Sequence, residues 1–271
     1  MEQYLVQNSR IWDQRVHKKK AHTRTVSKED LENPLKHIDP LGWLDGNVAG
    51  EKVLCLASGG GLQSILFAKA GADVTVLDIS SAMLDQDRKL ARDLGLKIKI
   101  LHQTMEDLSN LPDSYFDLIV QPVSTCYVPD VVGVYRQVAR IIKKRGLYIC
   151  QHKQPGSLQT SALPKNGSYT IEEKYYRSGP LKSLNGQFEH REPGAVEYLH
   201  RLEHLIGGLC REGFIIEDLM EPRHANSEAP VGSFGHRSLF SPPYILIKAR
   251  KRELNMDQIS HNRPSGLIIP G

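Results

Sequence analysis

The feature that most constrains the fold is a repeated alternation of short apolar runs with stretches of helical periodicity. The expected strands are the apolar runs at 52–56, 73–78, 97–101, 115–120 and 147–152, and the expected helices lie at 62–70, 80–94 and 130–142. Strands that alternate with helices form parallel βαβ units. Because the runs are almost continuously apolar, the strands should be covered on both faces. The pattern predicts an α/β fold with a doubly wound, mostly parallel sheet.

The alternation stops after residue 152. Residues 153–196 are rich in proline and glycine and contain one strand-like stretch at 169–176, and a helix is expected at 196–212. Two further strands are expected at 214–220 and 244–250, with no helix between them. Consecutive strands without a crossover helix pair antiparallel. We therefore predict seven strands, the last of them antiparallel at one edge of the sheet.

The two ends of the chain are more polar than its centre. Leu5, Ile11 and Trp12 indicate a short amphipathic helix, and a second helix should follow Ser27, an N-cap with Asp30 at the capping-box position. We predict three parts. Residues 1–50 form a helical cap or lid, residues 51–252 form the α/β domain with an insertion at 153–196, and residues 253–271 form a mobile tail.

Composition excludes several classes of protein. The chain has 271 residues, of which 40% are hydrophobic, so a packed core is expected. It has no apolar run of eighteen residues and its first residues have no apolar signal-peptide core, so we expect a soluble, cytoplasmic protein without a membrane span. The cysteines are widely spaced, which predicts reduced thiols and no metal site; they are Cys55, Cys126, Cys150 and Cys210.

The net charge of +4 is mild and permits anionic substrates without indicating nucleic acid. The densest basic run is at 17–24. A solvated surface segment is the favoured interpretation of such a run, and a patch that follows phosphates is the alternative.

A glycine-rich turn at 57–61 joins the first strand to the first helix, and Asp78 ends the second strand. Glycine lets backbone approach a ligand closely, and a helix N-terminus attracts negative charge. A carboxylate at the end of the second strand can accept hydrogen bonds from ribose hydroxyls. Together these features predict an adenosine-containing ligand. The alternative is a turn made only for packing, with Asp78 capping the next helix.

Two adenosine ligands compete for this loop. A dinucleotide fold has the loop pattern GxGxxG, usually near the start of the chain. Here Ser64 holds the third glycine position, and the loop lies after more than fifty residues. An antiparallel last strand also has no place in a dinucleotide fold, so a nicotinamide cofactor is disfavoured.

Residues 52–152 resemble class I S-adenosylmethionine-dependent methyltransferases, and residues 197–251 continue the resemblance in outline. The family pattern VLDLGCGxG is VLCLASGGG here, with Cys55 in place of an acid and Ala57 in place of a glycine. This loop is similar to that of a bacterial subgroup with ACGGGQQ-type loops. The stretch LPDSYFDLIV at 111–120 matches the family's PDxSFDxV and is the most specific part of the resemblance.

The resemblance implies the seven-stranded fold, S-adenosylmethionine as cofactor, and in-line transfer of its methyl group to a nucleophile. It implies that Asp78 binds ribose, that Met105 contacts adenine, and that Thr104 replaces an acid at the adenine amino group. The residues expected to bind the cofactor are Ala57, Ser58, Gly59, Gly61, Gln63, Asp78, Ile79, Met83, Thr104, Met105, Glu106 and Gln121.

The active site of an α/β sheet lies beyond the carboxyl ends of its strands. We therefore expect Tyr127, in the loop after the fourth strand, to contact substrate and take part in catalysis, and His152, at the end of the fifth, to act as a base. Trp12 and His236 are further candidates for substrate contact. The alternatives are that His152 and His236 only hydrogen-bond loops and that Trp12 packs on the sheet.

The leading hypothesis is methyl transfer to O, N or C of a small molecule. The alternatives are a non-catalytic protein that binds S-adenosylmethionine or S-adenosylhomocysteine and, less favoured, an NAD-binding oxidoreductase. The motif SPPY at 241–244 precedes the last strand and not the loop after the fourth, so it does not indicate methylation of a base amino group. A nucleic-acid partner is disfavoured, and a homodimer is compatible with the sequence.

Overall fold

The computed structural model describes residues 2–18, 23–183 and 190–253. The predicted tail, apart from its first residue, and the middle of the basic run at 17–24 lie outside the described residues. Within the described residues, no helix is both long and apolar enough to cross a membrane.

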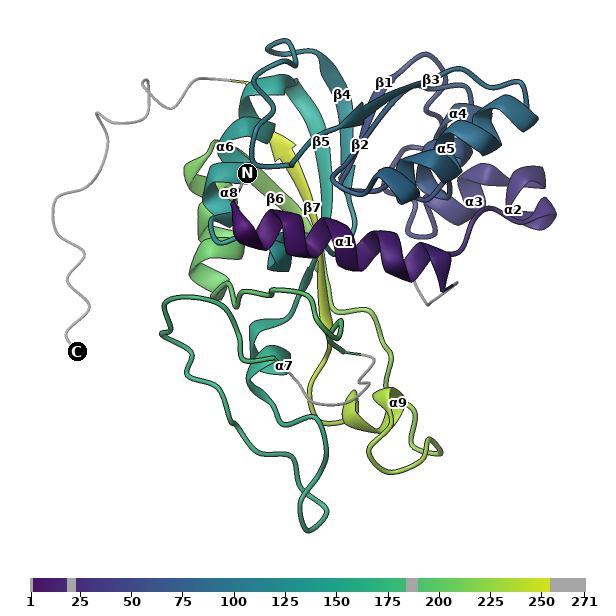
Figure 1. Cartoon of the computed structure of the whole chain (residues 1–271). Helices are drawn as coiled ribbons and strands as arrows, with labels where there is room; N and C mark the ends of the chain where they lie inside the picture. Colours follow the sequence, from purple (N-terminus) through teal and green to yellow (C-terminus); the bar gives the residue numbers. More distant parts are fainter. Residues whose placement is uncertain (1, 19–22, 184–189, 254–271) are drawn as a thin grey trace, which may run out of the picture.

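A single sheet organises the molecule (Figure 1). Its order is β3-β2-β1-β4-β5-β7-β6. Neighbouring strands among β1 to β5 are parallel, whereas β7 is antiparallel to both β5 and β6. The strands are β1 Lys52–Leu56, β2 Asp73–Asp78, β3 Ile98–His102, β4 Phe116–Gln121, β5 Ile142–Lys153, β6 Phe214–Met220 and β7 Tyr244–Lys251. The predicted doubly wound, mostly parallel sheet is confirmed, with the antiparallel pair at one edge.

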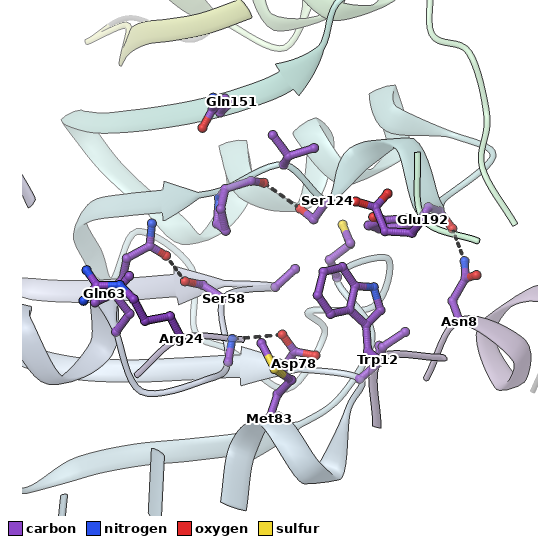
Figure 2. Close-up of a pocket in the computed structure, with 18 of the residues that line it drawn as sticks. Asn8, Trp12, Arg24, Ser58, Gln63, Asp78, Met83, Ser124, Gln151 and Glu192 are labelled. Carbon is purple, nitrogen blue, oxygen red and sulfur yellow. Dashed lines mark hydrogen bonds between the residues drawn. The ribbon is translucent and has the colours of Figure 1, made fainter. Parts of the chain in front are cut away.

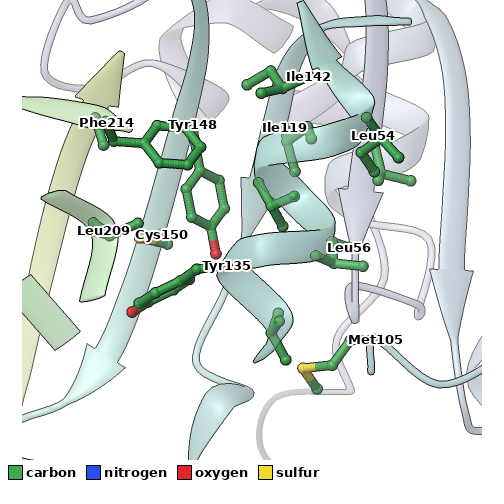
Figure 3. Packing of buried hydrophobic residues seen from close by; sticks show 14 of the residues in the cluster. Leu54, Leu56, Met105, Ile119, Tyr135, Ile142, Tyr148, Cys150, Leu209 and Phe214 are labelled. Atoms are coloured by element: carbon green, nitrogen blue, oxygen red, sulfur yellow. The ribbon is translucent and has the colours of Figure 1, made fainter. Parts of the chain in front are cut away.

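Helices cover both faces of the sheet because strand side chains alternate between them. Leu54 and Leu56 pack with α6 on one face (Figure 3), whereas Val53 and Cys55 pack with α4 and α5 on the other. The helices are α1 Gln3–His17, α2 Lys28–Glu32, α3 Pro34–Ile38, α4 Gln63–Lys69, α5 Ser81–Asp93, α6 Val131–Ile141, α7 Pro155–Gln159, α8 Gly208–Arg211 and α9 Phe234–Arg237, with a 3₁₀ turn at Thr125–Tyr127 and a π turn at Glu203–Gly207.

Three local predictions were wrong. The stretch 169–176 forms only an isolated antiparallel bridge from Ile171 to Thr160, because the N–H groups of the following Glu172 and Glu173 donate to the carbonyl oxygen of Gln159 at the end of α7. The helix predicted from 196 begins near Glu203, since the backbone N–H groups of Val196 and Tyr198 donate to Asn8 and Cys126 instead. The loop between β6 and β7 contains the short helix α9.

Several segments meet at the carboxyl ends of the parallel strands. Helix α1 crosses this edge of the sheet, and a lobe containing α7 and α9 extends below it (Figure 1). The capping box predicted at Ser27 and Asp30 is present at the start of α2. The arrangement surrounds the strand ends with chain from the N-terminal segment, the insertion and the β6–β7 loop.

Candidate active site

A cavity of about 640 Å³ lies at the carboxyl ends of the strands, a size typical of small-molecule sites. Figure 2 shows side chains that line it. We call the part formed by the loop after β1, the end of β2 and the start of α5, together with Arg24 and Met105, the glycine-loop end. We call the part formed by Trp12, Tyr127, Glu192, His224 and Tyr244 the aromatic end.

The loop at the glycine-loop end is bent tightly. Ala57, Gly60 and Gly61 all have positive φ, at 48°, 116° and 71°. A Cβ atom placed on Gly59 would lie 2.9 Å from Cβ of Met83 and 3.1 Å from Cβ of Asp78. The loop backbone therefore packs directly on β2 and α5, and a larger residue at 59 would push it away.

The carboxylate of Asp78 lines the glycine-loop end and is bonded to the loop. Its Oδ2 accepts from Gly59 N at 2.9 Å, and its Oδ1 accepts from Ser80 N at 2.9 Å. Burial raises the pKa of its carboxyl, although the backbone hydrogen bonds oppose the shift. The N-cap of α5 is Ser80, whose side chain accepts from Met83 N. Asp78 therefore does more than cap a helix, since it lines the cavity and joins it to the loop.

A second acid, Asp87 on α5, lies behind the loop with no exposed surface. Its carboxylate accepts from Gly60 N at 2.8 Å, from Gly61 N at 3.1 Å and from the hydroxyl of Ser64. Burial raises the pKa of Asp87 to about 6. Asp87 was not among the residues predicted from the sequence. The available signal was an acid four residues from Met83 and four from Ala91, on the buried stripe of α5.

Helix α1 contacts both ends of the cavity. The buried amide of Asn8 donates to the carbonyl oxygens of Tyr127 (3.2 Å) and Val196 (3.0 Å) and accepts from Val196 N at 2.7 Å. Asp13 accepts from the Ser80 hydroxyl at 2.6 Å. The ring of Trp12 lies edge-on to Tyr127, with ring centroids 5.8 Å apart.

Buried charges lie next to the aromatic end. Lys153 Nζ is 2.6 Å from Glu192 Oε2 and also contacts Glu197, which pairs with Arg191. The Tyr127 hydroxyl donates to the Glu192 carboxylate. Burial opposes ionisation of Glu192, but Lys153 holds the pKa of its carboxyl below the usual range. A charged carboxylate therefore lines the cavity.

His224 and Tyr244 complete the aromatic end. Their rings are edge-on, with centroids 5.3 Å apart. Burial lowers the pKa of His224, so the imidazole is neutral at pH 7. Burial raises the pKa of Tyr244 to about 12, so its hydroxyl keeps its proton. The neutral His224 ring is therefore a proton acceptor at the wall of the cavity.

The structure brings most of the predicted cofactor residues together and leaves four out of the wall. Those at the wall are Ala57, Ser58, Gly59, Gln63, Asp78, Ile79, Met83 and Met105, together with the predicted Trp12 and Tyr127. Gly61 faces Asp87, and Gln121 is buried behind Met105 and Ser124. Thr104 and Glu106 contact each other, and Glu106 accepts from the Tyr4 hydroxyl.

The two predicted histidines lie away from the cavity wall. Gln151 lines the cavity, so its neighbour His152 points to the opposite face of β5. There Nδ1 of His152 lies 2.8 Å from Thr125 Oγ1, and Nε2 lies 3.2 Å from the Tyr135 hydroxyl. Burial, with a smaller effect of His200, lowers the pKa of His152 to about 3. A base role for His152 therefore has no support from the geometry.

His236 on α9 contacts other residues of the lobe that contains α7 and α9. Its Nδ1 lies 2.9 Å from the Tyr169 hydroxyl, and its ring contacts Phe240.

The wall also contains residues that were not predicted from the sequence. They are Asn8, Arg24, Leu62, Gln103, Pro122, Val123, Ser124, Gln151, Glu192, His224 and Tyr244. Asn8, Glu192 and His224 come from segments whose sequence carries no motif, so only their meeting in space identifies them.

The residues at the glycine-loop end fit the cofactor that the sequence resemblance implies. Backbone approaches closely at Gly59, where a Cβ atom would collide with its surroundings. A carboxylate stands beside it at Asp78, and Met83 and Met105 supply apolar wall. Arg24 is the one lysine or arginine among the described residues of the wall, and Figure 2 places it beside Ser58 and Gln63. Close backbone, an acid and apolar surface suit an adenosine, while Arg24 suits a carboxylate.

Comparison with known proteins agrees with this geometry. A family profile described as "Methyltransferase domain" matches residues 54–150. An uncharacterized methyltransferase of Bacillus subtilis (strain 168), YbaJ, is 34% identical over 239 residues, which is 82% of this chain and 92% of that protein. A ubiquinone biosynthesis O-methyltransferase of Stutzerimonas stutzeri is 33% identical over 130 residues, which is only 46% of this chain and 56% of that enzyme.

Solved structures show the same fold. An S-adenosylmethionine-dependent methyltransferase from Mesorhizobium loti superposes with a TM-score of 0.64 at 24% identity. The match covers 82% of this chain and all of that one.

Proposed function

This chain belongs to the class I S-adenosylmethionine-dependent methyltransferases, and from that premise we propose that it methylates a small molecule bound at the aromatic end of the cavity. S-adenosylmethionine is its cofactor. The observation that carries the proposal is one continuous cavity, which joins the glycine-loop end to a wall of aromatic side chains and one carboxylate. A shared space is what a direct transfer between two bound molecules requires.

The glycine-loop end would hold the cofactor. Asp78, which lines this end, would accept hydrogen bonds from the ribose, and Met83 and Met105 would pack against the adenine. Arg24 would bind the carboxylate of the methionine part. When bound, the cofactor supplies an electrophilic methyl group on sulfur.

The aromatic end would hold the methyl acceptor. Trp12, Tyr127 and Tyr244 offer flat apolar surfaces that exclude water and suit a ring or another apolar body. Glu192 can accept a hydrogen bond from an N–H or O–H group of the acceptor. Among the described residues, no lysine or arginine lines this end. Compounds that carry a carboxylate or a phosphate are therefore expected to be poor methyl acceptors.

A general base must remove a proton from the methyl acceptor if its nucleophile is an alcohol, a phenol or a protonated amine. His224 lines the cavity, and its imidazole is neutral at pH 7. We assign the base to His224 in place of His152, which faces the other side of β5.

The first test is calorimetric titration of the full chain with S-adenosylmethionine, S-adenosylhomocysteine and NAD. Micromolar binding of both sulfur ligands, with none of NAD, is expected. The second step measures S-adenosylhomocysteine release with phenols, catechols and aromatic amines, against matched benzoates and phenyl phosphates. Turnover confined to the anionic compounds would contradict the role given to the aromatic end. The Glu192→Gln variant should retain S-adenosylhomocysteine affinity while losing turnover.

A further inference from the structure

Strand β1 carries no acid beneath the glycine loop. Cys55 occupies the position where the family pattern in the sequence has a carboxylate. Its thiol is fully buried among the side chains that pack between the sheet and α5. The strand therefore supplies no charged group to the backbone N–H groups of the turn that follows it.

Helix α5 supplies a carboxylate to the same place. Asp87 accepts from the N–H groups of both Gly60 and Gly61, at 2.8 and 3.1 Å, and from the Ser64 hydroxyl at the start of α4. Besides burial, the negative charge of Asp87 raises the pKa of the Cys55 thiol, as expected of neighbouring groups. The carboxylate thus lies beside the position from which the strand acid is missing.

We propose that Asp87 is the positioning residue of the cofactor loop in this protein, where the acid has moved from β1 to α5. The two glycines that it binds have the positive φ angles that bend the loop. A carboxylate that accepts two backbone N–H groups fixes that bend more strongly than a neutral acceptor does. Gly60 and Gly61 are thereby held toward α5, while Ala57, Ser58 and Gly59 form the wall of the cavity.

Ser64 belongs to the same set of hydrogen bonds around Asp87. Its side chain is fully buried, and its hydroxyl donates to Asp87. In the dinucleotide pattern this position is a glycine, so the serine that argued against a nicotinamide cofactor has a function of its own here. It adds a third donor to a carboxylate that would otherwise be poorly solvated.

The test measures binding of S-adenosylhomocysteine by calorimetry at pH 8, beside a thermal melt of each variant. Asp87→Asn keeps the size of the side chain and removes its charge. We expect about a tenfold loss of affinity, the equivalent of one charge-assisted hydrogen bond, with a cooperative melt retained. The matched control is Asp85→Asn, two residues earlier on α5 with an exposed side chain, which should bind as the wild type does.

Returning the acid to β1 separates positioning from general stability. Cys55→Asp alone places two carboxylates together and should weaken binding and lower the melting temperature. The double variant Cys55→Asp with Asp87→Asn should recover most of the lost affinity. A double variant no better than Asp87→Asn, or an Asp87→Asn affinity within about twofold of wild type, would overturn the proposal.

A third variant covers the case in which Asp87→Asn does not fold. Ser64→Ala removes only one donor and should cost severalfold in affinity, and unchanged binding would count against the proposal. The inference rests on the cofactor site described above, and wild-type protein distinguishes the two. Failure of wild type to bind S-adenosylhomocysteine overturns the site itself, whereas normal wild-type binding with an unaffected Asp87→Asn overturns only the role of Asp87.

Discussion

The two ends of the cavity are built in different ways. The walls of the glycine-loop end come mainly from one continuous piece of chain, from Ala57 in the turn after β1 to Met105. The aromatic end takes Trp12, Tyr127, Glu192 and Tyr244 from segments that are far apart in the sequence. A cofactor common to a family can be served by a local motif, whereas an acceptor particular to one protein is met by segments that the fold brings together. Damage to the two ends should therefore have different consequences.

The largest effect is expected from Lys153→Met, which leaves Glu192 and Glu197 buried without their shared cation. Loss of one partner of a buried ion pair costs about 3–5 kcal/mol, so urea unfolding should shift strongly to lower concentration. The control is Lys165→Met, whose pairing with Glu172 is exposed and worth little. If both variants unfold alike, the aromatic end does not depend on this buried network.

The second-largest effect is expected at the glycine-loop end of the cavity. Asp78→Ala removes the carboxylate that binds Gly59 N and that we propose to bind the ribose. We expect a loss of about 100-fold in S-adenosylhomocysteine affinity, measured by calorimetry, because charge-assisted hydrogen bonds are lost. Asp73→Ala, at the exposed start of the same strand, serves as the control. An unchanged affinity of Asp78→Ala would refute the placement of the ribose.

The pH dependence of stability sharpens the comparison further. Burial raises the pKa of Asp87 from 3.8 to about 6, so the folded state binds this proton more tightly than the unfolded state. The resulting stability is fully present below pH 3.8 and is lost as pH rises through about 6. Between these values the free energy of unfolding of wild type should fall by about 2–3 kcal/mol relative to Asp87→Asn. Parallel curves from chemical unfolding at a series of pH values would contradict this.

A smaller effect is expected where α1 joins the two ends. Asn8→Ala removes a buried amide and leaves the backbone groups of Tyr127 and Val196 without their partner. A cost of about 1–2 kcal/mol in unfolding free energy is expected. Val6→Ala, on the exposed side of α1, provides the matched control. Equal stability of the two variants would show that α1 is held by other contacts.

The contrast between the ends also explains what the sequence could predict. The strands, the glycine turn and Asp78 follow from local pattern, and the structure places them as expected. Glu192 and His224 lie in loops without a motif, so their position depends on contacts with chain far away. His152 was proposed as a base, yet its neighbour Gln151 is the residue that lines the cavity, because neighbouring strand side chains face opposite sides of a sheet. Residues 196–201 have helical periodicity but do not form a helix, because backbone N–H groups of this segment donate to α1 and to the loop after β4.

The anchoring of α1 by Asn8 has a consequence for how the chain assembles. The partners of Asn8 at Tyr127 and Val196 lie 119 and 188 residues later in the chain. Contacts between such distant parts of a sequence form late, because a long loop must first be closed. Helix α1 is therefore expected to dock late, and the cavity should reach its final shape only after most of the chain has folded.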